Sequence, residues 1–219
     1  MSESSLKLTS NYRITEQLNL LSGLHFVETE VTNLDDVDNP LYRLKISEVV
    51  RLYSAFSQIG FVSKNRNTAF NIGTRFNYLD KFKKSILEPR FSFNQKFLND
   101  FRFEILGEFK HQYTSQVVNF QNDFLGIEKR RWQLSNNEEI PVITSKQLST
   151  GISFSKKGWL LSLEGYYKMV DGITSQSQGF QNQYRFSNVS GSYDVKGIDF
   201  LFRKGIGSFS GWLSYSFMD

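Results

Sequence analysis

Apolar and polar side chains alternate residue by residue in the segment from Phe101 to Lys110. Such a period of two predicts a β-strand with one apolar face and one charged face. A tilted strand needs about 9–11 residues to cross a bilayer. In lipid, only a helix or a closed barrel pairs all of its backbone groups, so this pattern predicts the wall of a transmembrane β-barrel. The alternating residues are Phe101, Phe103, Ile105, Gly107 and Phe109 on one face and Arg102, Glu104, Leu106, Glu108 and Lys110 on the other.

The composition is compatible with such a barrel. The chain of 219 residues has 21 Phe, 10 Tyr and 3 Trp, yet its mean hydropathy is only −0.38. Many aromatic residues in a polar chain are typical of an outer-membrane barrel, whose lumen and loops are wet, and also of a soluble β-sandwich. No apolar run approaches the roughly 18 residues of a transmembrane helix. Cysteine is absent, which excludes disulfides, thiolate nucleophiles and cysteine-based metal sites.

Charge and the N-terminal residues bear on partners and export. The formal net charge is +4, but the basic residues are dispersed, so we expect no nucleic-acid partner. Residues 1–5 have neither the basic region nor the apolar region of a secretory signal. Because a barrel protein must be exported, we expect this sequence to be an internal piece of a longer protein.

About ten segments have strand-like patterns. The connections between them differ in length: those near 15–17, 62–67, 98–100, 155–158 and 204–207 are short, and polar stretches at 29–46, 114–144 and 171–192 are predicted as long loops. Only the short connection near 80–84 breaks the alternation. Short turns at one end and long loops at the other are typical of bacterial outer-membrane barrels. The predicted strands are residues 5–14, 18–28, 49–61, 68–79, 86–97, 101–113, 146–154, 159–169, 193–203 and 208–217.

One strand register follows from a short turn. If Leu98–Asp100 is a three-residue turn, Phe97 faces Phe101 in the antiparallel partner. The same register places Arg90 opposite Glu108 and Glu88 opposite Lys110. Both are pairs of opposite charge, which stabilise antiparallel pairing by a few tenths to about 1 kcal/mol each.

No catalytic, cofactor or metal constellation is evident, and we expect no enzyme activity and no cofactor. The two histidines, His25 and His111, are interpreted as solvated or lumen-facing residues. Asp35–Asp38 lacks the glycine and the terminal glutamate of a calcium loop and is read as a surface loop. Gly205–Gly207 is predicted as a turn, and Lys129–Trp132 as a basic and aromatic segment that packs in a loop.

Aromatic residues recur near the predicted strand ends. In a membrane barrel, such residues form girdles at the two membrane–water interfaces. We therefore expect interfacial positions for Tyr12, Tyr78, Tyr113, Trp159, Tyr167 and Tyr215.

Glu88–Phe93 begins with Glu-Pro-Arg, and it resembles a strand of TonB-dependent outer-membrane receptors that carries the same three residues. Gln147–Ile152 followed by Trp159–Lys168 resembles the next hairpin, which Asp171–Ile173 continues. Lys196–Phe200 resembles a strand near the end of the barrel. Each motif is short, and their serial order across residues 45–218 is the specific part.

The resemblance implies a barrel of about 22 strands, plugged by an N-terminal domain, that imports a nutrient with energy relayed by TonB. The present sequence has no recognisable TonB box, plug domain or last strands, so we expect residues 1–219 to be a partial barrel domain in the outer membrane. The implied partners are outer-membrane lipid, a small nutrient ligand, and TonB and a plug through the missing part. The ligand class (siderophore, cobalamin or oligosaccharide) and the ligand-binding residues stay unknown.

Two alternatives remain open from the sequence. One is a complete small outer-membrane barrel of about ten strands, such as an omptin-like protein or a pore. The other is a soluble β-sandwich that binds a ligand.

Overall fold

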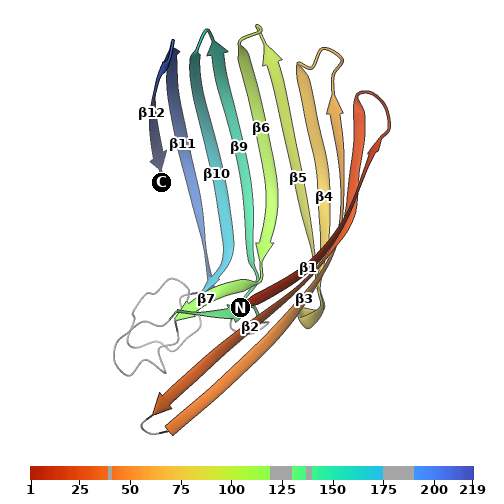
Figure 1. Ribbon diagram of the computed structural model, residues 1–219, viewed down its shortest axis with the longest axis vertical. Helices are drawn as coiled ribbons and strands as arrows, with labels where there is room; N and C mark the ends of the chain where they lie inside the picture. The colour runs from red at the N-terminus through yellow and green to blue at the C-terminus, as the bar shows by residue number, and fades with distance from the viewer. Residues whose placement is uncertain (39–40, 119–129, 137–139, 175–189) are drawn as a thin grey trace.

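The structure is a computed structural model that describes residues 1–38, 41–118, 130–136, 140–174 and 190–219. Ten strands form one antiparallel sheet in which each strand pairs with its neighbour along the chain, except that β6 pairs with β9 (Figure 1). The strands of this sheet are β1 (Ser2–Arg13), β2 (Leu18–Asp38), β3 (Leu41–Val62), β4 (Thr68–Leu79), β5 (Lys84–Phe97), β6 (Phe101–Gln112), β9 (Ile143–Lys156), β10 (Trp159–Thr174), β11 (Ser190–Ile206) and β12 (Phe209–Met218).

Two smaller elements complete the described chain. The strands β7 (Thr114–Val118) and β8 (Arg130–Leu134) pair with each other and form a separate hairpin. A single 3-10 turn, η1 (Asp80–Phe82), connects β4 to β5. Among the described residues, no helix has the length and hydropathy that are required to span a bilayer.

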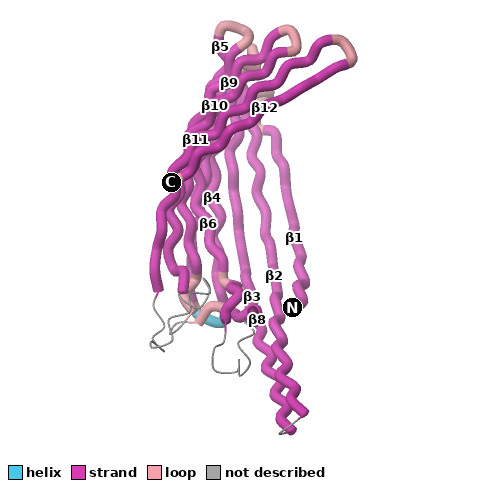
Figure 2. The backbone as a smooth tube through the Cα atoms, turned by 90° about the vertical axis from the view of Figure 1, so that its left-hand side faces the viewer, coloured by secondary structure: helices cyan, strands magenta, loops and turns pink. Residues whose placement is uncertain are grey.

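All ten predicted strands are confirmed as members of the sheet, although most extend beyond the predicted ends. The tight connections lie together at one end of the sheet (Figure 2), and the opposite end of the strands is called the long-loop end. At two of the tight turns, consecutive residues adopt positive φ, namely Leu98 and Asn99 (48° and 61°) and Lys157 and Gly158 (47° and 78°). This backbone geometry matches the right-handed twist of the flanking strands.

The prediction of a long loop at residues 29–46 is wrong, because β2 and β3 continue through this range as a paired hairpin. Its polar residues bond across the ladder: Ser47 Oγ donates to Glu30 Oε1 at 2.6 Å and lies 3.0 Å from Thr32 Oγ1. Polar side chains that pair with each other are as compatible with a strand as apolar ones, so polarity alone does not mark a loop here. The hairpin projects well beyond the other strands (Figure 2).

The other two predicted loops are shorter than expected. The stretch 114–144 contains β7, β8 and the first residues of β9, and residues 119–129 and 137–139 of it lie outside the described part. The stretch 171–192 contains the end of β10 and the start of β11, and its residues 175–189 also lie outside.

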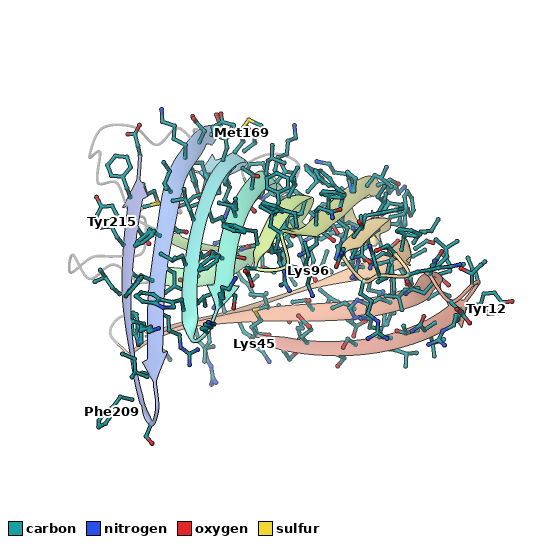
Figure 3. All side chains as sticks on the ribbon, turned by 90° about the horizontal axis from the view of Figure 1, so that it is seen from above. Tyr12, Lys45, Lys96, Met169, Phe209 and Tyr215 are labelled. Atoms are coloured by element: carbon teal, nitrogen blue, oxygen red, sulfur yellow. The ribbon has the colours of Figure 1, made fainter. Side chains whose placement is uncertain are left out.

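The register keeps two distinct faces across the whole sheet. One outward row runs through Leu8, Leu24, Ala55, Phe76 and Leu87, each opposite the next in its ladder. Seen from above, the sheet is a curved wall from which Tyr12, Met169 and Tyr215 project on the convex side, while Lys96 lies on the concave side (Figure 3). An inner row on the concave face consists of Arg90, Glu108, Gln147 and Lys168.

The buried core is small and lies on the concave face at the long-loop end. One cluster comprises Val27, Leu52, Leu79 and Ile86, with Phe82, Phe109, Tyr113 and Val142 packed against it. A second cluster joins Val31 and Val50 of the long hairpin to Leu134 of β8. The hairpin β7–β8 is therefore held against the inside of the wall.

The sheet is open in the described part of the chain, with β1 and β12 as its edges. A closed ten-stranded barrel would require these two strands to pair, and a sandwich would require a second large sheet. Neither alternative from the sequence matches this architecture.

Candidate functional site

The convex face carries an apolar belt built by the strand alternation. Its residues are large and exposed to a degree that is unusual for a soluble surface, such as Ile72 at 60% and Leu163 at 48%. A representative row across β6, β9, β10, β11 and β12 consists of Phe103, Ile152, Leu163, Phe200 and Tyr215. A sheet whose outward side chains are this apolar is suited to contact with lipid.

Aromatic residues border the belt at both ends. On β10, Trp159 lies beside a tight turn, with Lys204 Nζ 4.0 Å from its ring centroid, and Tyr167 lies toward the long-loop end. These two residues are eight positions apart, which at about 3.3 Å per residue is about 26 Å along the strand. Apolar bands of outer-membrane barrels are about 25 Å tall. Tyr12 at the tight-turn end and Tyr78, opposite Tyr53 at the long-loop end, also face outward, as expected.

Two of the six expected girdle residues are elsewhere. Tyr113 follows the end of β6 and packs on the inner face, where its hydroxyl lies 3.2 Å from Thr29 Oγ1. The chain leaves the sheet at this point and turns inward, so the interfacial position expected for Tyr113 is wrong. Tyr215 does face outward, but its partner Phe200 belongs to the middle of the belt and not to its border.

The concave face holds a hydrogen-bonded network centred on Arg75. Its Nη2 lies 2.6 Å from His25 Nδ1 and donates to Ser54 Oγ at 3.0 Å, while its Nε donates to Asn77 Oδ1 at 2.9 Å. A guanidinium group only donates, so His25 Nδ1 must be the acceptor, and a neutral His25 carries its proton on Nε2. Ser54 also donates to Asn77 Oδ1 at 2.8 Å. Four side chains from β2, β3 and β4 are thereby fixed on the inner wall.

Glu88 and His111 form a contact on the inner face in which both side chains are buried. Their side chains are only 7% and 5% exposed. Glu88 Oε1 accepts hydrogen bonds from the backbone N–H of His111 at 2.9 Å and from its ring Nδ1 at 2.6 Å. Glu88 also lies opposite Arg75 in the β4–β5 ladder, so it is near the Arg75 network.

The predicted register is confirmed near the turn and fails further along. Phe97 faces Phe101 and Arg90 faces Glu108, but the β5–β6 ladder ends at that last pair. The predicted pair of Glu88 with Lys110 is therefore wrong. Lys110 Nζ instead lies 2.7 Å from Glu108 on its own strand, and the carboxylate of Glu88 contacts His111.

A polar hollow of about 350 Å³ lies on the concave face between β3 and β10. Beside the hollow, Gly73 lies opposite Arg90, and an added Cβ there would lie only 2.9 Å from Gln58 Cβ, so Gln58 packs closely over this glycine. Carboxylates, a guanidinium, amides and hydroxyls converge there, as in a surface that binds polar groups. Its polar lining consists of Gln58, Asn71, Arg90, Ser92, Glu108, Gln147, Ser149 and Glu164.

The remaining sequence candidates do not form a site. No group of three or more metal-ligating residues occurs within the described ranges. Asp35–Asp38 belongs to β2, so the surface loop expected there is wrong. Gly205 and Ile206 end β11, and only Gly207 of the predicted turn, at φ 57°, has turn geometry. Arg130–Trp132 belongs to β8, where Trp132 O accepts from Asn33 Nδ2 at 3.0 Å, and Lys129 lies outside the described residues.

Sequence reasoning missed the Arg75 network and the Glu88–His111 contact. The available signal was that His25, Ser54, Arg75 and Asn77 all occupy polar positions of their strands. Their proximity, however, depends on the registers of β2–β3 and β3–β4, which no short turn in the sequence specified in advance.

Comparison with known proteins gives similarity of fold without similarity of sequence. No protein-family model matches the chain, and no curated protein matches it significantly. The siderophore receptor PirA from Acinetobacter baumannii matches with a TM-score of 0.62 at 15% identity, over 99% of this chain and 36% of that one. The ferric enterobactin receptor PfeA matches with a TM-score of 0.67 at 13% identity, over 98% and 35%. The RagAB peptide transporter matches with a TM-score of 0.64 at 12% identity, over 99% and 29%.

The chain thus spans roughly a third of the length of these receptor and transporter structures. At these identities the similarity is one of fold. The expected fold class, an all-β antiparallel up-and-down barrel wall that corresponds to part of a larger barrel, is confirmed.

Proposed function

We propose that this chain forms part of the barrel wall of a TonB-dependent outer-membrane receptor that imports a nutrient ligand. The observation that carries the proposal is the two-faced sheet. One continuous face is an apolar belt bordered by aromatic residues, and the other is a charged and hydrogen-bonded concave wall. A membrane barrel that conducts a polar solute requires both faces at once.

The fold neighbours support transport as the activity. Their names describe a siderophore receptor, a ferric enterobactin receptor and a peptide transporter. These ligands differ chemically, so we propose a small nutrient ligand of the siderophore, cobalamin or oligosaccharide class and name no single one. We further propose that the receptor also has a plug domain and interacts with TonB, and that both lie in regions of the receptor fold that correspond to no part of this chain.

We propose a wall and ligand-contact role for the inner face, and not a catalytic one. Its charged groups already have hydrogen-bond partners, since Arg75 bonds to Ser54, Asn77 and His25, and Glu88 bonds to His111. The more accessible groups around the polar hollow, among them Arg90 and Glu164, are the ones that we expect to meet a solute or a plug.

The test uses the full-length protein that contains this chain. It would be expressed in a bacterium that lacks its own siderophore, cobalamin and maltodextrin receptors, and uptake of each labelled ligand would be measured with and without TonB. We expect the protein in the outer-membrane fraction and TonB-dependent accumulation of one ligand class.

Recovery of the protein in the aqueous fraction would refute the membrane location. Equal uptake with and without TonB would refute the receptor mechanism and would favour the alternative of a passive pore.

A further inference from the structure

The outer face has a groove where β5 and β6 separate. Their ladder ends at Arg90 and Glu108, although β5 starts at Lys84 and β6 ends at Gln112. Each strand stays paired with its other neighbour: β5 with β4 as far as Lys84, and β6 with β9 as far as Gln112. The two strands therefore diverge like a wedge within an otherwise continuous wall.

This groove is lined mainly by residues of the apolar belt. Its volume is about 750 Å³, and its walls include Leu87 and Pro89 of β5, Leu148 of β9 and Met169 of β10. Phe109 lines the same groove and also packs against the buried cluster of the inner face. It thus closes the groove toward the lumen, and the groove opens toward the convex side.

The lining of the groove includes two cations, Arg90 and Lys146, and Arg90 lies opposite Glu108 in the β5–β6 ladder. Lys146 lines the groove, is exposed, and faces Phe109 and Met169 in the two ladders of β9. Among the described residues, no carboxylate lies within ion-pair distance of Lys146. Lys196 on the same face, by contrast, lies 3.3 Å from Asp219. An ammonium group beside lipid is stabilised when an anionic headgroup is within reach.

We propose that this groove binds an acyl chain of a membrane lipid whose net-negative headgroup contacts Lys146. The groove is continuous with the belt that faces the bilayer, so the medium in contact with it is lipid. It lies toward the long-loop end of the strands, which in outer-membrane barrels is the extracellular side. The inference rests on the proposed function only for the location of the barrel in a membrane.

The experiment reconstitutes the full-length protein into bilayers that contain either phosphatidylglycerol or phosphatidylcholine with a photoactivatable acyl chain. Crosslinked residues are then mapped by mass spectrometry. We expect crosslinks at Phe109 and Met169 to exceed those at Ile198 severalfold, although Ile198 faces outward at 53% exposure. Phosphatidylglycerol should give more crosslinks than phosphatidylcholine.

Two matched pairs of variants sharpen the test. Leu148→Trp fills the groove and should lower the crosslinks at Met169 about tenfold, since it removes the apolar space that the chain occupies. Ile198→Trp, outside the groove, should leave them unchanged. Lys146→Gln should lower the preference for phosphatidylglycerol about fivefold, whereas Lys196→Gln, whose lysine already has a carboxylate partner, should change it little.

Crosslinks spread evenly over the belt, or unaffected by Leu148→Trp, would overturn the proposal, as would equal crosslinking by the two lipids. Crosslinking does not depend on uptake. A protein that transports its ligand but shows no groove preference refutes only the lipid site, and a protein with the preference but without TonB-dependent uptake refutes only the transport function.

Discussion

One oxygen of Glu88 accepts two hydrogen bonds from His111, from the backbone N–H at 2.9 Å and from ring Nδ1 at 2.6 Å. The contact lies just beyond the last paired residues of β5 and β6. The backbone N–H of His111 lies beyond the end of the β5–β6 ladder, and the side chain of Glu88 on β5 accepts its hydrogen bond. Because an ionised carboxylate only accepts, Nδ1 of His111 must carry a proton. Glu88 therefore holds the two diverging strands together.

Removal of this carboxylate should destabilise the protein. In Glu88→Ala, a buried N–H and a ring N–H of His111 lose their acceptor, which should lower the free energy of unfolding by about 3 kcal/mol. Glu88→Gln keeps a carbonyl oxygen and should lose about half as much. The measurement is the unfolding midpoint of the full-length protein by gel mobility on heating. Glu164→Ala, on the same face, is the control and should change the free energy by less than about 0.5 kcal/mol.

Gly107 should not tolerate a side chain. An added Cβ would overlap the ring of Phe91, which covers this glycine from the facing position of β5. Gly107→Ala must displace that ring and should cost about 1–3 kcal/mol of stability. Gly165→Ala is a matched control on the same outer face, since its nearest contact would be 4.0 Å away. Equal stability of the two variants would contradict the packing of Phe91 over Gly107.

A charged residue at an outward position of the belt should block assembly of the barrel. A charged residue at the adjacent inward position should be tolerated. Leu163 faces outward at 48% exposure, and Ser162 faces the lumen side of the same strand. Leu163→Arg places a guanidinium near the middle of the bilayer, at a cost of about 2–4 kcal/mol. Ser162→Arg should assemble almost normally. The readout is the yield of folded protein in the outer membrane, and a similar loss for both variants would argue against the assignment of the faces.

The phenol of Tyr113 should ionise at a higher pH than an ordinary tyrosine, and this should make the stability of the protein fall at alkaline pH. Burial is the main cause that raises the pKa of Tyr113 above its ordinary value of 10.0. The unfolded chain then loses the proton of this phenol at a lower pH than the folded protein, so stability should fall as the pH rises above about 10. The difference in tyrosinate absorbance between the full-length protein and its Tyr113→Phe variant measures this pKa. A value at or below the ordinary one would show that Tyr113 is solvated.

The strands that alternate most regularly were the easiest to predict. Residues 101–110 needed only their period of two, and the tight turn at Leu98–Asp100 was enough to place Arg90 opposite Glu108. The same rule failed at residues 29–46, because Glu30, Thr32 and Ser47 bond to one another across the hairpin. Two polar strands whose side chains hydrogen-bond to each other resemble a loop when the sequence of each strand is considered separately.

The sequence by itself determined the two faces of the wall, since side chains of a strand alternate in direction whatever its partner is. The tertiary structure decided where neighbouring strands stop pairing and what fills the space between them. That Glu88 contacts His111, that Phe109 closes the wedge and that Tyr113 turns inward all depend on the ladder ending at Arg90 and Glu108. Beyond this end point β6 stays paired with β9, which is distant from β5 in the chain, and no local periodicity distinguishes a paired residue from an unpaired one.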